Sequence, residues 1–322
     1  MIAAELCAGG GGTALGLEQA GFTHGALVEI DADACATLRL NRPGWPVHHG
    51  DITTGSLTGS FGLVSAGLPC TPHSRGGRQL GADDERHLWD AALRIIGEAR
   101  PRAVMLETAD AILSAKFDGE RAGTLGRLAA LGYAGLRWQV IDASEHGVPQ
   151  RRRRAVLVAF LDQRAAAAFR WPEPSGRPPP AVGDVLYPLM AARGWPGADA
   201  WRAGAQGVAP VLTGGSRKHG GPDLGASQGK AAWRRLGIDP MGIADEAPGP
   251  DGKFRRGAGK IFDAAESGPM LTIEMAALIQ GFPPGWLFCS GKTADYRQVG
   301  NALPPPAARA AGAAIMAALG AP

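Results

Sequence analysis

The sequence contains few cysteines, and their spacing is unlike that of a disulfide framework or a zinc site. Only four occur among 322 residues, and no two of them form a CxxC pair. This usage fits a reducing compartment, and we expect no disulfide and no metal. Long apolar runs are also lacking, since every run is well short of the ~20 residues that a membrane span needs. The N-terminal residues lack the basic segment of a secretory signal, so we expect a cytoplasmic protein with no membrane partner.

The net charge is small, at +3, but the charge is unevenly distributed. Residues 151–260 contain 18 Lys and Arg against 9 Asp and Glu, whereas the rest of the chain contains 15 against 21. A basic segment joined to an acidic remainder favours a polyanionic partner, although a solvated surface with no partner would have the same composition.

The first twenty residues have the pattern of a strand, a glycine-rich turn and a helix. Ile2 to Leu6 is an apolar strand, and Thr13 to Ala20 has helical character. The turn between them reads Gly9-x-Gly11-x-x-Ala14, which is typical of nucleotide-binding folds, where the backbone approaches a ligand closely. By itself this signal is weak, because glycine-rich turns are common.

Two acids follow at positions that suit a nucleotide-like ligand. Glu29 ends a second apolar strand, 18 residues beyond Gly11, where a carboxylate accepts hydrogen bonds from a ribose diol. Asp31 or Asp33 can cap the next helix, which leaves Glu29 for the ligand. Asp51 lies in a turn after a third element and could accept from the exocyclic amine of an adenine.

A cysteine and a carboxylate follow two further apolar runs. Cys70 comes shortly after the run 61–66, and Glu107 directly follows the run 103–106. Continuous apolar runs predict buried parallel strands, whose carboxyl ends meet at one edge of the sheet. A thiol there is placed as a nucleophile would be, although a lone cysteine is more often a small buried apolar residue.

A row of basic residues leads into the next apolar strand, 155–160. Because side chains alternate along a strand, we expect Gln150, Arg152 and Arg154 to project together, away from Arg151 and Arg153. A basic patch that serves only solubility is the alternative.

The composition changes near residue 170. Prolines and glycines interrupt the strand–helix pattern, which places a domain boundary near 165–180. The run Gly214 to Gly221, with Arg217 and Lys218, could be a loop that contacts phosphates and base edges. Regular structure returns with a helix that Thr272 can cap and with a final Ala-rich helix, 307–319.

The order of these elements resembles the DNA (cytosine-5)-methyltransferase family. Nine stretches match motifs of that family, in the family's order: 5–12, 28–31, 50–52, 67–70, 107–109, 150–154, 271–274, 280–283 and 298–301. The resemblance implies an α/β fold, with a Rossmann-like, mostly parallel sheet covered by helices on both faces and a smaller, irregular target-recognition domain. We expect a catalytic domain over 1–168, the target-recognition domain over 169–265, and C-terminal motifs over 266–322 whose last helix returns to the catalytic domain.

The resemblance also implies the activity and the site residues. The methyl donor would be S-adenosylmethionine, with S-adenosylhomocysteine as product and no metal, and the partner would be double-stranded DNA with its target cytosine flipped out of the helix. Cys70 would add to C6 of that cytosine. The implied catalytic residues are Cys70, Glu107, Arg152 and Arg154. The implied cofactor-binding residues are Leu6, Cys7, Gly9, Gly11, Glu29, Ile30, Asp51, Ile52, Pro69 and Asn301. The implied DNA-binding residues are Ser74, Arg75, Arg78, Gln150, Arg217 and Lys218. We expect a monomer with no obligate protein partner, acting in restriction–modification.

The sequence departs from the family pattern at three places. Glu5 stands where the family usually has aspartate, and Cys7 where it has an aromatic residue that stacks on the donor, which puts donor affinity in doubt. Thr108 follows Glu107 where the family has asparagine, so Glu107 could be positioned less firmly.

Three rival functions remain open at this stage. A tRNA methyltransferase of the same fold would carry a Cys-Phe-Thr tripeptide, which the sequence lacks. A catalytically inactive DNA-binding relative would not need Cys70 and Glu107. An NAD-dependent oxidoreductase would account for Gly9 to Glu29 but not for the C-terminal motifs.

Overall fold

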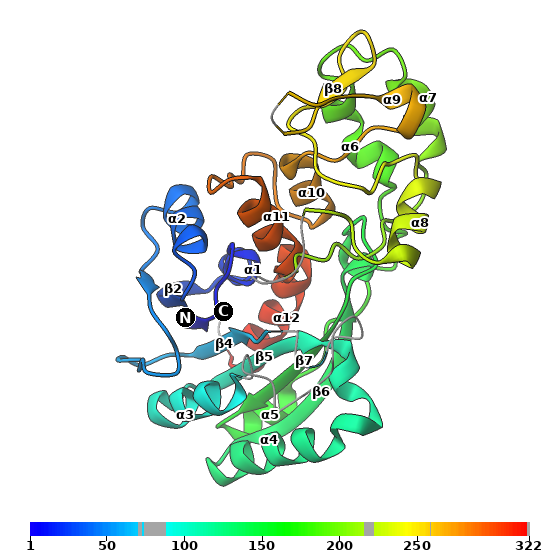
Figure 1. The fold of residues 1–322 in the computed structure, drawn as a ribbon. Coiled ribbons are helices and arrows are strands. Elements are labelled where there is room, and N and C mark those ends of the chain that lie inside the picture. Colours follow the sequence, from blue (N-terminus) through cyan, green and yellow to red (C-terminus); the bar gives the residue numbers. More distant parts are fainter. Residues whose placement is uncertain (70–72, 74–87, 216–221, 258, 321–322) are drawn as a thin grey trace. The chain divides into compact units, whose positions relative to one another are not determined.

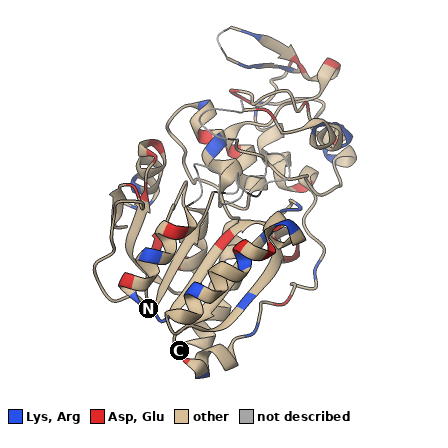
Figure 2. Ribbon diagram, turned by 60° about the horizontal axis from the view of Figure 1, so that its bottom comes forward, with Lys and Arg blue, Asp and Glu red and all other residues tan. Residues whose placement is uncertain are grey.

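The computed structural model describes residues 1–69, 73, 88–215, 222–257 and 259–320 (Figure 1). The chain divides into two compact units. The first unit contains residues 1–142, 153–173 and 305–322, and the second contains 143–152 and 174–304. Each unit therefore draws on segments that are far apart in the sequence. Lysine and arginine residues are mixed with acidic ones in both units (Figure 2).

The first unit is built on a seven-stranded sheet with the order β3-β2-β1-β4-β5-β7-β6. Its strands are β1 (Ile2–Leu6), β2 (Thr23–Glu29), β3 (Val47–His49), β4 (Leu63–Gly67), β5 (Ala103–Ala109), β6 (Ala134–Asp142) and β7 (Arg153–Phe160). The first five strands pair in parallel, whereas β7 runs antiparallel to both β5 and β6. This mostly parallel α/β sheet confirms the fold class expected from the sequence.

Both faces of the sheet are buried, as the continuous apolar runs predicted. Val104 and Leu106 of β5 pack in a core with residues of α3 and α4, while Ala103 and Met105 point to the opposite face and are equally buried. The helices of this unit are α1 (Gly12–Gln19), α2 (Ala32–Asn41), α3 (Trp89–Ala99), α4 (Asp118–Ala130), α5 (Gln163–Ala168) and α12 (Pro305–Ala318), with short 3-10 turns η2 (Asp110–Leu113) and η3 (Ala115–Phe117).

Helix α12 packs closely against α1 in the first unit. A Cβ atom added to Gly16 of α1 would lie 2.5 Å from the Cβ of Ala308 and 2.5 Å from the carbonyl oxygen of Pro305. Only glycine permits this approach, because real Cβ atoms do not come so close to other heavy atoms. The last helix thus belongs to the first unit.

The second unit has short helices and a two-stranded hairpin in place of a large sheet. Its elements are η4 (Ala143–His146), α6 (Val182–Ala191), α7 (Ala198–Gly204), α8 (Ser227–Arg235), β8 (Lys253–Arg255), β9 (Ile261–Asp263), α9 (Ala264–Ser267), α10 (Ile273–Ile279) and α11 (Lys292–Asn301). Strands β8 and β9 pair antiparallel, and Phe254 of β8 packs with Met270 in a small core. The Thr272 hydroxyl accepts a hydrogen bond from the Met275 N–H and caps α10, as the sequence predicted.

The boundaries of the two units differ from the three domains expected from the sequence. The first unit extends to residue 173, and residues 266–304 group with the second unit. Residues 143–152 also group with the second unit, although they lie between β6 and β7. Among the described residues, no helix has the length and apolar character that crossing a membrane requires.

Candidate active site and cofactor-binding residues

The glycine turn after β1 is held in backbone conformations that favour glycine. Gly9 has φ of 53° and Gly11 has φ of 91°, both in the left-handed region. A Cβ atom added to Gly9 would meet no heavy atom within 4 Å, so the space beside this residue is open. The turn therefore has room for the close approach of a ligand that the sequence predicted.

Glu29 braces this turn from the end of β2. Its Oε2 atom accepts a hydrogen bond of 2.7 Å from the Gly9 N–H, and its Oε1 atom accepts one of 2.7 Å from the Asp31 N–H. Asp31 caps α2 by accepting from the Asp33 N–H, as expected. Burial raises the pKa of Glu29. Each carboxylate oxygen can accept a second hydrogen bond, so Glu29 can hold the turn and still accept from a hydroxyl group.

The other predicted donor-site residues of the first unit differ in exposure. Ile30 has 62% of its surface exposed, whereas the side chains of Leu6 and Ile52 pack in the core, so only their backbone atoms could contact a ligand. Asp51 accepts a hydrogen bond from the Thr53 N–H through Oδ1. Pro69 is half-buried.

Carboxylates surround the thiol of Cys7. Cys7 has φ of 56°, an uncommon value for a residue with a side chain. Burial, together with the negative charges of Glu29, Glu5 and Asp51, raises the pKa of the Cys7 thiol. Burial also raises the pKa of Glu5 well above its usual range, against the effect of a hydrogen bond from Thr13. Cys7 therefore remains a neutral thiol, and Glu5 binds its proton more tightly than an exposed glutamate.

Glu107 and Arg154 form an ion pair across the β5–β7 ladder. The Arg154 Nε atom lies 3.0 Å from the Glu107 Oε1 atom, and the side chains are 14% and 6% exposed. The Nε–H does not point at the oxygen, so the contact is an ion pair without an aligned hydrogen bond. The family resemblance implied that both residues are catalytic, and the structure brings them into contact.

The end of strand β4 lies beside Glu107. Gly67 pairs with Glu107, and the Leu68 N–H donates a hydrogen bond of 2.9 Å to the Glu107 carbonyl oxygen. A Cβ atom added to Gly67 would lie 3.7 Å from Glu107 Oε2, so the carboxylate reaches over this glycine. The chain that leads to Cys70 thus leaves the sheet next to the Glu107 side chain.

Six predicted site residues lie outside the residues that the structure describes. They are Cys70, Ser74, Arg75, Arg78, Arg217 and Lys218. His73, which is described, was not singled out from the sequence. It is fully buried, its Nε2 atom lies 2.7 Å from Glu120 Oε1, and its ring meets Phe117 edge-on. This contact ties His73 to helix α4, and nothing in the local sequence indicated it.

The structure corrects the expectation for Gln150. Strand β7 begins at Arg153, so the strand alternation that grouped Gln150 with Arg154 does not extend back to this residue. Gln150 is fully buried: its Nε2 atom donates to Gln280 Oε1 at 2.8 Å, and its Oε1 atom accepts from the Leu212 N–H at 3.0 Å. The amide is thus hydrogen-bonded within the protein, and the DNA contact expected of Gln150 stays a prediction that no described contact supports.

Arg152 is likewise enclosed by the second unit. It is 1% exposed, its Nη1 atom donates to the Leu212 carbonyl oxygen at 2.9 Å, and its Nη2 atom donates to the Gly300 carbonyl oxygen at 2.8 Å. These bonds fasten the segment around Leu212 to helix α11. Both Nη atoms of the guanidinium are thus hydrogen-bonded within the protein, and the catalytic role expected of Arg152 stays a prediction.

Asn301 lies at the end of α11, beside the same segment. Its Nδ2 atom donates to the Gly215 carbonyl oxygen at 3.2 Å. A Cβ atom added to Gly214 would lie 2.5 Å from the Arg297 carbonyl oxygen, so the two backbones touch. Asn301 is exposed, which leaves its side chain accessible to a ligand.

A family model described as C-5 cytosine-specific DNA methylase matches residues 1–201 and 243–317. The chain belongs to this family. The sequence-based resemblance is therefore confirmed, and this methylase is a DNA (cytosine-5-)-methyltransferase. The stretch that the family model leaves unmatched, 202–242, lies entirely in the second unit.

Two relatives of this methylase match it over almost its whole length. Type II methyltransferase M.NaeI of Lentzea aerocolonigenes is 47% identical over 321 residues, which are 98% of this chain and 74% of the relative. Type II methyltransferase M.NgoMIV of Neisseria gonorrhoeae is 41% identical over 325 residues, covering 98% of this chain and 97% of the relative. The tRNA-directed and inactive alternatives are not favoured.

Solved structures share the fold of this methylase at low sequence identity. A protein described as a DNA modification methyltransferase encoded within a prophage (E. coli) has a TM-score of 0.67 at 18% identity and covers 99% of both chains. A mutant of Spodoptera frugiperda DNMT2 has a TM-score of 0.60 at 13% identity and covers 99% of both chains. These similarities support the methyltransferase fold.

Proposed function

We propose that this methylase transfers a methyl group from S-adenosylmethionine to C5 of a cytosine that is flipped out of duplex DNA, through a covalent bond between Cys70 and C6. The observation that supports this most is the Glu107–Arg154 ion pair beside the end of β4, three residues before Cys70 in the chain. We also propose that the protein acts as a monomer in restriction–modification, as its Type II relatives suggest. The cytoplasmic location stays a prediction.

The residues near the glycine turn suit the methyl donor. When bound, S-adenosylmethionine supplies an electrophilic methyl group and leaves as S-adenosylhomocysteine. Glu29 would accept from the ribose hydroxyls, Asp51 from the adenine amine, and the exposed Ile30 would cover the adenine ring. The open space beside Gly9 and its left-handed backbone support this assignment. Asn301, whose amide is exposed in the second unit, stays a predicted donor-binding residue.

The carboxylates around Cys7 favour a cationic donor and keep this thiol neutral. A neutral thiol is a poor nucleophile, so Cys7 would not compete with the base for the methyl group. The same negative surroundings stabilise the positive charge of a sulfonium. Cys7 is therefore compatible with donor binding, although it lacks the aromatic ring that the family usually has there.

In the proposed reaction, the Cys70 thiolate forms a bond to C6 of the cytosine, and the electrons of the C5–C6 double bond make C5 nucleophilic. After C5 is methylated, a base removes the C5 proton and the Cys70–C6 bond breaks, which restores the aromatic ring. Glu107 would bind the N3/N4 edge of the cytosine and stabilise the charge that develops on addition. Arg154 would orient Glu107, and its positive charge would favour the thiolate.

A covalent trapping experiment tests this proposal. Wild-type protein is incubated with labelled S-adenosylmethionine and a DNA duplex that contains 5-fluorocytosine, whose C5 fluorine cannot be removed as a proton. We expect a denaturation-resistant protein–DNA adduct with wild type and none with Cys70→Ser. On ordinary duplex DNA, label should appear as 5-methylcytosine. Label in another base, or full activity of Cys70→Ser, would refute the mechanism.

A further inference from the structure

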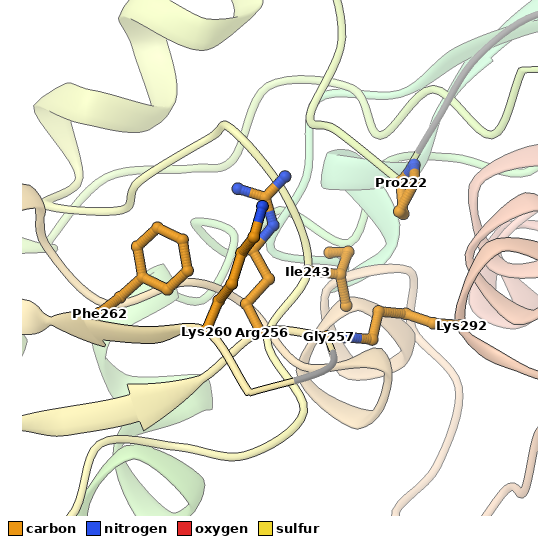
Figure 3. A pocket seen from close by; sticks show the side chains of 7 residues that line it. All are labelled: Pro222, Ile243, Arg256, Gly257, Lys260, Phe262 and Lys292. Carbon is orange, nitrogen blue, oxygen red and sulfur yellow. The ribbon is translucent and has the colours of Figure 1, made fainter.

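The second unit contains a basic cavity that the reaction just described does not use. It lies where the β8–β9 hairpin faces the start of α11 and has a volume of about 400 Å³. Three cationic side chains line it, from Arg256, Lys260 and Lys292, together with the apolar side chains of Phe262 and Ile243 (Figure 3). Three positive charges around one hollow are costly unless acids or a bound anion offset them.

One of these cations is neutralised by the protein. Lys292 forms an ion pair with Asp245, and this contact lowers the Asp245 pKa. Asp245 also accepts a hydrogen bond of 2.8 Å from the Gly257 N–H in the hairpin turn. The pair therefore joins the turn to α11, and Lys292 is an internal support of the cavity.

The other two cations have no such acid. Among the residues that the structure describes, neither Arg256 nor Lys260 pairs with a carboxylate, whereas their neighbour Arg255 pairs with Glu246 at 2.9 Å. The Arg256 guanidinium lies over the Phe262 ring, 5.6 Å from its centre, which holds it toward the cavity. Figure 3 shows the Arg256 and Lys260 side chains extending in the same direction. Two adjacent, uncompensated cations favour a bound anion.

We infer that this cavity binds a backbone phosphate of the DNA duplex, outside the flipped cytosine. The inference rests on the proposed activity of the protein on duplex DNA, whose backbone phosphodiester is the anion that would reach the cavity. Phe262 and Ile243 add apolar surface that suits the adjoining deoxyribose, which a free phosphate ion lacks. The three cationic residues of the cavity lie outside the stretch 202–242 that the family model leaves unmatched, although Pro222 of its lining lies within it. A phosphate contact positions DNA without reading bases, so the cavity would contribute affinity and little sequence preference.

The salt dependence of DNA binding tests this inference. The double variant R256Q/K260Q removes both uncompensated charges, and K253Q removes one charge from the same hairpin, at an exposed lysine that does not line the cavity. Binding of a labelled 30-bp duplex, without methyl donor, is measured between about 50 and about 200 mM salt. The slope of log Kd against log salt should decrease by about 0.9 in the double variant, because the loss of one phosphate contact removes about 0.9. K253Q and the charge-preserving variant R256K/K260R should keep the wild-type slope.

An unchanged slope in R256Q/K260Q, or an equal decrease in K253Q, would overturn the inference. Wild-type methylation of the same DNA separates this failure from failure of the proposed function, since methylation would then continue. If wild-type protein neither bound nor methylated duplex DNA, both would fail. Inorganic phosphate at millimolar concentration should compete with the duplex in wild type and less in R256Q/K260Q, because both anions would use the cavity. Binding of inorganic phosphate to wild type that leaves duplex binding unchanged would identify a free-anion site and contradict the inference.

Discussion

The Arg154 Nε atom lies 3.0 Å from Glu107 Oε1, between neighbouring strands of the first unit. This contact compensates the charge of a carboxylate that is only 6% exposed. Because the partner strand supplies the compensation, Thr108 beside Glu107 is not needed to hold it. The doubt that the sequence raised about the positioning of Glu107 is answered by a residue 47 positions further along the chain.

Removing the arginine should leave the Glu107 charge uncompensated. We expect Arg154→Ala to lower the free energy of unfolding by roughly 3 kcal/mol, as is usual when one partner of a buried pair is removed. Methyl transfer should fall at least about 100-fold, because both positioning and charge stabilisation are lost. Denaturant unfolding and single-turnover methylation measure these effects. Arg154→Lys, which keeps the charge, should recover part of the activity. No recovery would mean that the shape of the arginine side chain, and not its charge, supports methyl transfer.

Arg152 should act on stability rather than on the base. In Arg152→Met, the Leu212 and Gly300 carbonyl oxygens lose their buried donors, and we expect a loss of roughly 3 kcal/mol in the free energy of unfolding. The neighbouring Arg151 is exposed, so Arg151→Met is the matched control and should change stability by less than about 0.5 kcal/mol. Equal unfolding curves for the two variants would contradict the stabilising role of the Arg152 hydrogen bonds.

Glu5 should make stability depend on pH. Its folded-state pKa is raised, mainly by burial, above the value of about 4.3 expected for the unfolded chain. Such a group contributes stability that is fully present below the unfolded pKa and is lost as pH rises through the folded pKa. Glu5→Gln stays neutral, so its advantage over wild type should grow by about 1.4 kcal/mol per pH unit between these two pKa values. Urea unfolding from pH 4 to pH 9 measures this advantage, and an equal advantage of Glu98→Gln, at an exposed residue of α3, would contradict the role of burial at Glu5.

The cysteines should differ in their reaction with an alkylating reagent. Burial raises the pKa of Cys35 to about 11 and raises that of Cys7, so both carry little thiolate near pH 8. Cys289 is exposed. Iodoacetamide at pH 8, followed by peptide mass spectrometry, should modify Cys289 well before Cys7 and Cys35. Early modification of Cys7 would contradict the carboxylate-rich surroundings described for it.

The contact between α1 and α12 should not tolerate a methyl group. Gly16→Ala places a Cβ atom against Ala308 and the Pro305 carbonyl oxygen, and we expect a loss of about 2 kcal/mol or more in stability. Gly123 of α4 has open space around its Cβ position, so Gly123→Ala should stabilise the protein by about 0.5–1 kcal/mol through helix propensity. Thermal unfolding of the two variants should shift in opposite directions.

Local patterns predicted much of the first unit. The apolar runs gave the buried strands, the glycine turn and Glu29 were found together, and the carboxyl ends of β4 and β5 meet as parallel neighbours do. The helix cap at Thr272 was also visible, because capping depends on residues three positions apart.

Contacts between distant segments were not predictable in this way. Gln150 and Arg152 were assigned by strand alternation, but their partners Leu212 and Gly300 lie 60 or more positions away and hold them outside the strand. His73 is similarly fixed by Glu120, 47 positions later. A local residue pattern predicts the structure of its own segment alone. Whether a polar side chain is buried depends on the segment that supplies its hydrogen-bonding partner.

The first unit is assembled from three segments, and its closing helix α12 follows the whole of the second unit in the chain. A ribosome therefore synthesises the sheet early, but α1 has no α12 to pack against until residues 305–318 emerge. Until then, the α1 surface around Gly16 and the glycine turn before it are left without their final support. The first unit would thus reach its final fold only after residues 305–318 have been synthesised, which delays modification of DNA by a partly synthesised chain.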